Sequence, residues 1–138
     1  MIKYNIIITT SLILLINGEY IDNKYLKKNK YAENNAINKY FSSNDKVRFI
    51  FNVFDSFPKN DYLEYNEVEL LQKITDPQLP LNIDDYKYVC KLLNSNIYYG
   101  ITLDEFNSSY YLYRHELGTN LNKDFDIVYE LVYNSNKI

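Results

Sequence analysis

The 138-residue sequence predicts an all-α fold. Apolar residues recur at positions i, i+3, i+4 and i+7 in several successive segments, which is the spacing of one face of a helix. Residues that favour helix starts precede these segments, and Pro or Gly follows two of them. Hydrophobic residues make up 46% of the chain, so a packed core is expected. The length suits one compact domain.

Residues 1–18 have the layout of a secretory signal peptide. Lys3 gives a positive start, residues 6–16 form an apolar run, and Gly18 offers a small residue for cleavage. This run is too short to cross a bilayer as a helix. We therefore expect a secreted protein, or one of the secretory-pathway lumen, without a membrane span in its mature chain. A buried strand or helix of the folded domain is the alternative interpretation. Residues 19–42 are expected to form a polar N-terminal segment.

Residues 43–118 carry two helix–loop–helix patterns in tandem. In the first, a helix follows Ser42, Ser43, Asn44 and Asp45, any of which could cap it. A polar loop then leads to a second helix that ends at Asp76-Pro77. The apolar faces of these two helices are Val47, Ile50, Phe51 and Phe54, followed by Val68, Leu71 and Ile74.

The second pattern starts near Asp84, which can cap its first helix. Its second helix is expected to run unbroken to Gly118, because glycine is typical of helix C-termini. Residues 119–138 contain one more amphipathic helix and a tail. The apolar faces of these three helices are Tyr86, Val89, Cys90 and Leu93, then Phe106, Tyr110, Tyr113 and Leu117, then Phe125, Val128, Tyr129 and Val132.

The tandem arrangement resembles a pair of EF-hands, the helix–loop–helix units that bind calcium through oxygen ligands. Each pattern places an aliphatic residue four positions before a glutamate: Leu63 precedes Glu67, and Ile101 precedes Glu105. In that family the two aliphatic residues pair across a short antiparallel β bridge, and the glutamate gives two oxygens to calcium. The resemblance therefore implies a paired EF-hand domain with calcium as its cofactor.

The resemblance makes Asp55 the first position of the first loop and Glu67 its twelfth. One extra residue is inserted within residues 56–60, where Phe57-Pro58 replaces usual ligand positions. The carbonyl of Tyr62 and a water on Glu64 are among the sources of oxygen that the pattern implies. The candidate metal ligands of this loop are Asp55, Asn60, Asp61, Tyr62, Glu64 and Glu67.

The second loop has the regular length of the family but fewer acidic residues. Glu105 is the one charged ligand that the pattern implies there, and Tyr99 stands where glycine is usual. We therefore expect weak calcium binding, with the first loop as the stronger site. The candidate ligands of the second loop are Asn94, Asn96, Gly100, Thr102 and Glu105.

Two functions follow from these patterns. The first is a small secreted EF-hand-like protein that binds calcium weakly. The second is a metal-free module that docks a helical peptide or protein partner, in which residues 124–132 are expected to fill the groove between the two units. An unrelated helical bundle is the alternative fold. A net charge of −3 gives no electrostatic basis for binding nucleic acid. One His, one Cys and no glycine-rich phosphate loop indicate that the protein is not an enzyme.

Overall fold

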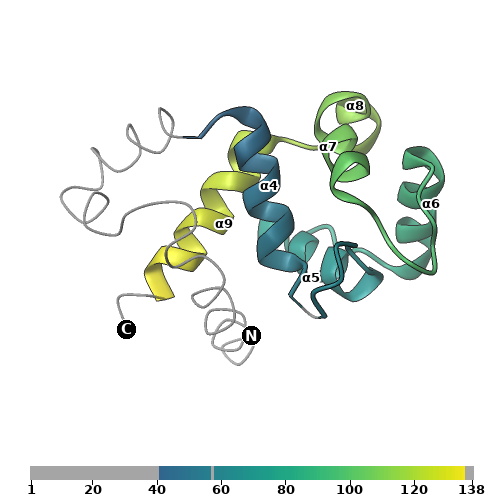
Figure 1. Cartoon of the computed structure of the whole chain (residues 1–138), viewed down its shortest axis with the longest axis horizontal. Coiled ribbons are helices and arrows are strands. Elements are labelled where there is room, and N and C mark those ends of the chain that lie inside the picture. Colours follow the sequence, from purple (N-terminus) through teal and green to yellow (C-terminus); the bar gives the residue numbers. More distant parts are fainter. Residues whose placement is uncertain (1–40, 57, 136–138) are drawn as a thin grey trace.

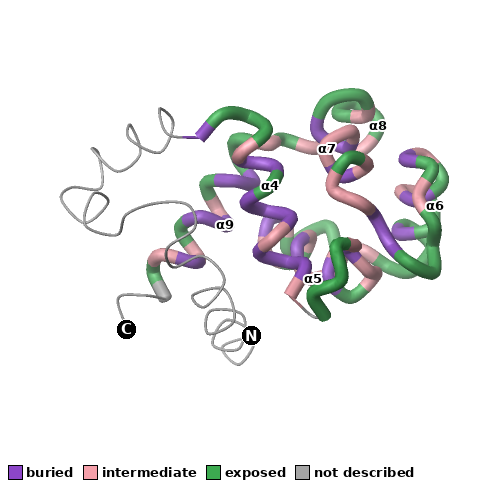
Figure 2. Tube along the Cα trace, in the orientation of Figure 1, coloured by how far each residue is buried: buried purple, intermediate pink, exposed green. Residues whose placement is uncertain are grey.

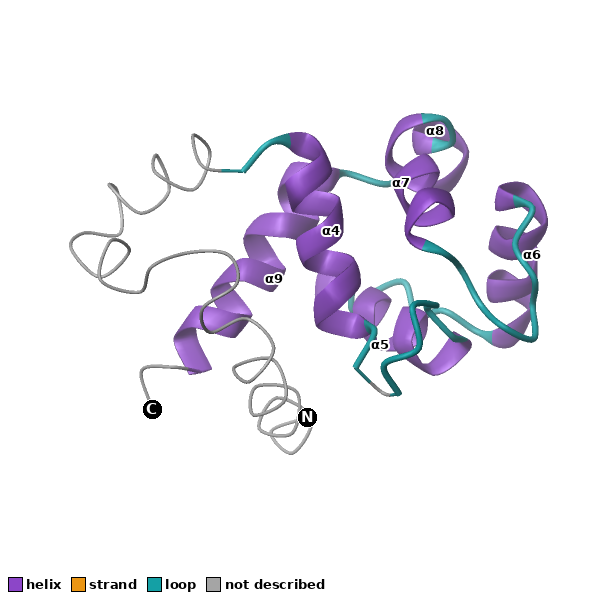
Figure 3. Ribbon diagram, viewed as in Figure 1, coloured by secondary structure: helices purple, strands orange, loops and turns teal. Residues whose placement is uncertain are grey.

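The computed structural model describes residues 41–56 and 58–135 (Figure 1). The expected leader, residues 1–18, and almost all of the expected polar segment, residues 19–42, lie outside this part of the chain. The described part is all-α, with helices joined by loops (Figure 3). None of its helices is both long and apolar enough to cross a membrane. The helices are α4 (Ser43–Phe54), α5 (Tyr65–Thr75), α6 (Ile83–Leu93), α7 (Leu103–Tyr111), α8 (Arg114–Leu117) and α9 (Leu121–Ser135).

Ser42, one of the four candidate caps, caps helix α4. The Ser42 hydroxyl accepts a hydrogen bond from the Asp45 N–H at 3.2 Å, and the Asp45 carboxylate accepts one from the Ser42 N–H at 3.4 Å. The helix is buried along most of its length (Figure 2). This burial arises because α9, α7 and α5 all pack against it. Helix α4 is therefore the centre of the core.

Helix α6 begins earlier than the sequence indicated. The Asn82 side-chain oxygen accepts a hydrogen bond from the Asp85 N–H at 2.8 Å, and the Asp85 carboxylate accepts one from the Asn82 N–H at 3.1 Å. Asp84 lies inside the first turn, so the expectation that it caps the helix was wrong. Asn82 is favoured because an acid stands three residues after it and completes the reciprocal pair of hydrogen bonds.

The helix expected to run unbroken to Gly118 is divided into α7 and α8. The Tyr113 N–H donates to the Ser108 carbonyl at 3.0 Å. The next carbonyl, that of Ser109, accepts the Thr119 hydroxyl at 2.6 Å instead. This contact comes from a residue beyond the helix, and the sequence pattern of the helix contains no sign of it. Gly118 ends α8 in the left-handed conformation, as expected of a C-terminal glycine.

The two helix–loop–helix units meet at their loops in an antiparallel backbone bridge. The Leu63 N–H donates to the Ile101 carbonyl at 2.8 Å, and the Ile101 N–H donates to the Leu63 carbonyl at 2.9 Å. Both aliphatic residues are buried. The bridge expected between these two residues is therefore present.

Helix α9 packs against α4 and α5 (Figure 1). Its apolar face joins an aromatic cluster in which the Phe125 ring lies 5.1 Å from the Phe41 ring and 5.4 Å from the Phe49 ring, centre to centre. Phe125 and Val128 are fully buried there. Of the described residues of α9, Asp124 alone borders the space between α5, α6 and α7, so the helix does not fill the space between the two units, which differs from the expectation for residues 124–132.

Candidate metal loops and apolar groove

Asp55 closes the first loop from its beginning. It follows the last residue of α4 and is fully buried. Its two carboxylate oxygens accept the N–H groups of Asn60 at 3.0 Å and Asp61 at 2.8 Å. Burial raises the pKa of the Asp55 carboxyl above its ordinary value of 3.8, although these two hydrogen bonds and the positive charge of Lys59 oppose the shift.

Glu67 closes the same loop from its end. It is fully buried, and one of its carboxylate oxygens accepts the Glu64 N–H at 2.8 Å. The Glu64 carboxylate accepts the Asn60 side-chain amide at 2.9 Å, and the Asn60 side-chain oxygen accepts the Tyr62 N–H at 3.1 Å. The polar groups of these residues therefore bind one another within the loop.

The first loop makes its sharp turn at Asp61. This residue has φ of 67°, and counting back from Glu67 as the twelfth position makes Asp61 the sixth. The sixth position is the one where the EF-hand pattern expects glycine. Asp tolerates the left-handed region better than most residues because its short polar side chain can bond locally. The backbone of the first loop therefore turns at the residue that the resemblance makes its sixth position.

The second loop is closed by a different set of contacts. One Glu105 carboxylate oxygen accepts the Ser95 hydroxyl at 2.8 Å and the Thr102 N–H at 2.9 Å. The Thr102 hydroxyl accepts the Glu105 N–H at 3.2 Å, so the same two residues also cap α7. The twelfth-position glutamate of this loop is therefore held by a hydroxyl from the opposite end of the loop.

The remaining candidate ligands of the second loop shape its backbone. Asn94 adopts the left-handed conformation and ends α6, with φ of 59°. The Asn96 side-chain oxygen accepts the N–H groups of Tyr98 at 2.8 Å and Tyr99 at 3.0 Å. Gly100, with φ of 112°, makes the second left-handed turn, whereas Tyr99 does not.

The donor set of each loop bears on whether it fits calcium. Within residues 41–56 and 58–135, no group of three or more His, Cys, Asp and Glu side chains is placed to hold a metal ion. In the second loop Glu105 accepts a hydrogen bond from Ser95, and no other candidate ligand carries a charge. The first loop has four acidic candidate ligands: Asp55 and Glu67, which are fully buried, and Asp61 and Glu64, which lie between them in the sequence. The first loop is therefore the better match to calcium chemistry.

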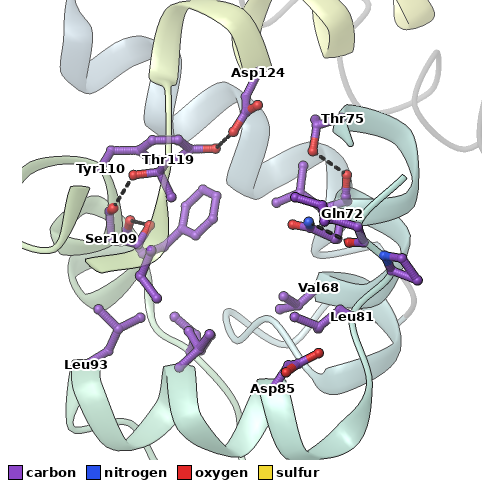
Figure 4. A pocket seen from close by; sticks show the side chains of 17 residues that line it. Val68, Gln72, Thr75, Leu81, Asp85, Leu93, Ser109, Tyr110, Thr119 and Asp124 are labelled. Atoms are coloured by element: carbon purple, nitrogen blue, oxygen red, sulfur yellow. Dashed lines mark hydrogen bonds between the residues drawn. The ribbon is translucent and has the colours of Figure 1, made fainter. Parts of the chain in front are cut away.

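A pocket of about 370 Å³ lies between α5, α6 and α7 (Figure 4). Its walls are largely apolar: Val68 and Leu71 come from α5, Val89 and Leu93 from α6, and Phe106 from α7. Ile101, one of the two bridge residues, also lines it. The pocket therefore lies on the bridge that joins the two units.

The uncharged polar side chains that line the pocket all donate hydrogen bonds within the protein (Figure 4). The Gln72 amide donates to the Leu79 carbonyl at 2.8 Å, and the Tyr110 hydroxyl donates to the Asp124 carboxylate at 2.7 Å. The hydroxyls of Thr75, Ser109 and Thr119 each donate to a main-chain carbonyl. The pocket therefore offers apolar surface rather than a set of unused donors.

Two aspartates are the charged residues of the lining. Asp124 lies at one end of the pocket and Asp85 at the other (Figure 4). Burial raises the pKa of the Asp124 carboxyl, the hydrogen bond from Tyr110 lowers it, and the negative charge of Asp76 adds to the increase. The charge that the pocket presents is therefore negative.

The chain was also compared with known proteins. No family model, curated protein or solved structure matches it.

The roles of two hydroxyl groups that shape the loops were not identified from the sequence. The Ser95 hydroxyl holds Glu105, and the buried Tyr86 hydroxyl donates to the Leu63 carbonyl at 3.2 Å. A Ser follows the first position of both loops, as Ser56 and Ser95, and this repeat was the available signal. Ser56 nevertheless behaves differently, since its hydroxyl donates back to carbonyls of α4.

Proposed function

We propose that this chain is an EF-hand-like pair that docks an apolar helical segment of a partner protein between α5, α6 and α7. The observation that carries the proposal is the apolar pocket of about 370 Å³, whose uncharged polar side chains already bond within the protein. Such a surface offers a polar ligand few free hydrogen-bond donors, whereas the apolar face of an amphipathic helix could bury its side chains against it.

The negative charge of the pocket indicates which charged residues the partner helix should carry. Asp85 and Asp124 stand at its two ends, and no Lys, Arg or His is among the residues that line it. A carboxylate has several acceptor positions, so each aspartate retains capacity for a donor from a ligand. We therefore propose a partner helix with an apolar face and basic residues near its ends.

A synthetic amphipathic peptide tests this function. The probe is about four helical turns (~15 residues) long, with Leu along one face and Lys at both ends. Fluorescence anisotropy of the labelled peptide measures its binding to the full chain. We expect Val89→Glu to weaken binding at least ~10-fold, because it places a charge against an apolar face. Tyr88→Glu is the matched control, since Tyr88 is an exposed neighbour on α6 outside the pocket.

The charge of the pocket is tested with the same peptide. Asp124→Asn is expected to weaken binding about 2- to 5-fold at low salt, because it removes one of the two negative charges that line the pocket. Asp126→Asn, on the same helix but outside the pocket, serves as its control. Equal binding by wild type and Val89→Glu would show that the pocket is not the docking site, and preference for a Glu-ended peptide would reverse the proposed charge of the partner.

Calcium binding at the first loop is the second candidate function. The burial of Asp55 and Glu67 favours it, because a divalent cation would offset the desolvation that raises the pKa of Asp55. Asn60, Asp61, the Tyr62 carbonyl and Glu64 would supply further oxygens. The expected secretory leader is part of this proposal. Extracellular calcium-binding modules have dissociation constants of ~10⁻⁴ to 10⁻³ M, so a weak site is useful there.

Terbium luminescence tests the second candidate. Tyr62 lies in the first loop and can transfer excitation to a bound lanthanide, so binding appears as sensitised emission. We expect emission that calcium competes away and that Glu67→Gln abolishes. Glu69→Gln, two residues along the same helix, should leave it unchanged. Absence of emission at millimolar terbium would remove calcium binding from the function and leave the docking proposal intact.

A further inference from the structure

The second loop joins the ends of two helices that both line the pocket. Helix α6, which supplies Val89 and Leu93, ends at Asn94. Helix α7, which supplies Phe106 and Tyr110, begins after Thr102. Any contact across this loop therefore bears on how far apart the two walls stand.

One hydrogen bond spans the loop from end to end. The Ser95 hydroxyl, at the end of α6, donates to Glu105 in the first turn of α7 at 2.8 Å. The Ser95 N–H meanwhile donates to the Cys90 carbonyl of α6 at 2.7 Å, so Ser95 is anchored to that helix. One oxygen of the carboxylate that a cation would require thus accepts a hydrogen bond from a side chain of the protein itself.

The bridge to the first unit depends on the same loop. Ile101 stands immediately before Thr102, the residue whose N–H shares the Glu105 carboxylate oxygen with Ser95. Across the bridge, Ile101 pairs with Leu63, which precedes α5. Gly100 fits here only because it lacks a side chain, since an added Cβ would lie 2.5 Å from the Leu63 carbonyl oxygen. The loop is therefore a tightly defined link among three helices.

The first loop provides an internal comparison. Ser56 occupies the corresponding place after Asp55, yet its hydroxyl donates to the Asn52 and Val53 carbonyls at 3.2 and 3.0 Å. The two loops therefore close in different ways, although the same residue type stands at the same position. In the second loop alone the serine reaches across to the glutamate.

We infer that the Ser95–Glu105 hydrogen bond is a metal-independent lock, which holds α6 and α7 in one arrangement whether or not calcium is present. Since it concerns the pocket walls, the inference rests on the proposed docking function. If this hydrogen bond holds without metal, the pocket is present at all times and does not require calcium to open it. Glu105 then has a structural partner in place of a metal.

Hydrogen exchange of the Ile101 amide tests the lock. The full chain is measured in a chelator, so that no metal contributes. Ser95→Ala is expected to accelerate exchange about 10-fold, since hydrogen bonds to charged groups are among the stronger ones. Ser56→Ala is the matched control and should leave the Ile101 rate unchanged. Ser95→Thr keeps a hydroxyl and is expected to restore much of the protection. Equal rates in wild type and Ser95→Ala would overturn the inference.

A calcium titration completes the test. It uses the Glu67→Gln chain, so that calcium at the first loop does not contribute to the result. We expect millimolar calcium to leave the Ile101 exchange rate unchanged, whereas slower exchange would show that the second loop takes a cation and would contradict the lock. Failure of the docking proposal is seen in a different experiment, as equal peptide binding by wild type and Val89→Glu. That outcome would not change the hydrogen-exchange result.

Discussion

At the scale of single residues, two left-handed glycines differ in their surroundings. Gly100 has φ of 112° and lies against the Leu63 main chain, where an added Cβ would come within 2.5 Å of the carbonyl oxygen. Gly118 has φ of 63° and has nothing within 4 Å of the added Cβ. The first glycine is required by its φ and by close packing, the second by its φ alone.

Alanine substitution should separate these two requirements. We expect Gly100→Ala to lower the free energy of unfolding by about 3 kcal/mol or more, because backbone strain adds to a collision with main-chain atoms. Gly118→Ala should cost about 1 kcal/mol, which reflects the left-handed conformation alone. Urea denaturation of both variants measures the difference. Similar losses would mean that the Leu63 main chain moves away easily.

A buried aspartate should make stability depend on pH. The folded-state pKa of Asp124 is raised chiefly by burial, so the folded protein holds its proton to a higher pH than the unfolded chain does. The stabilisation that protonated Asp124 gives the folded state is therefore complete below the pKa of about 3.8 in the unfolded chain. It is lost as pH rises through the pKa in the folded state. We expect the free energy of unfolding of wild type, relative to Asp124→Asn, to fall as pH rises from about 3.8.

Denaturation of both proteins across that pH range checks this sign. Tyr110→Phe should enlarge the dependence, because its hydroxyl stabilises the charged carboxylate and lowers the Asp124 pKa. A difference between wild type and Asp124→Asn that rises with pH would contradict the assignment.

At the scale of the helices, local capping pairs mark where α4, α6 and α7 begin. Ser42 with Asp45, Asn82 with Asp85, and Thr102 with Glu105 each form reciprocal hydrogen bonds. In each pair the acid stands three residues after the cap, so the pattern is visible in the sequence. Helix ends are less local, since the break between α7 and α8 involves Thr119, which lies beyond both helices.

The cap of α4 offers a matched pair of variants. Ser42 and Ser43 are adjacent and exposed, but only Ser42 accepts the Asp45 N–H. We expect Ser42→Ala to lower the free energy of unfolding by about 1 kcal/mol. Ser43→Ala should change it by less than about 0.5 kcal/mol, as surface substitutions usually do. Thermal or urea denaturation distinguishes the two, and equal effects would show that the cap contributes nothing specific.

At the scale of the whole molecule, α4 is covered from several sides. Its Phe49 ring packs against Phe125 of α9, and its Phe51 ring faces Phe106 of α7 with ring centres 5.9 Å apart. The core therefore joins the two helix–loop–helix units to the C-terminal helix. Removal of α9 would expose a fully buried face of the central helix.

Substitution of one ring should show how much this cluster stabilises the fold. Phe125 is fully buried, so Phe125→Ala is expected to lower the free energy of unfolding by about 3–5 kcal/mol, through lost burial and the cavity left behind. Leu112→Ala is the control, because Leu112 is 73% exposed and should cost little. A small effect at Phe125 would mean that α9 is only loosely attached to the rest of the molecule.

Much of the fold could be predicted from the sequence because helix periodicity and capping are local. The apolar faces from Val47 to Phe54 and from Tyr86 to Leu93 lie on α4 and α6. The bridge between Leu63 and Ile101 was expected from the resemblance to a pair of EF-hands. The candidate ligands were found as loop residues, but their hydrogen-bond partners were not. Ser95 illustrates the reason, since its target is Glu105, at the far end of the loop.

The sequence by itself determined that this protein is helical, and it placed a reciprocal capping pair at the start of α4, α6 and α7. These properties depend on residues within a few positions of one another, whose contacts are set by backbone geometry. The tertiary structure alone decided where α9 packs, that a pocket remains open between α5, α6 and α7, and how each loop glutamate is held. Those outcomes depend on contacts between segments that are distant in the sequence. Local sequence permits several arrangements of the helices and loops, and packing and desolvation over the whole core select one of them.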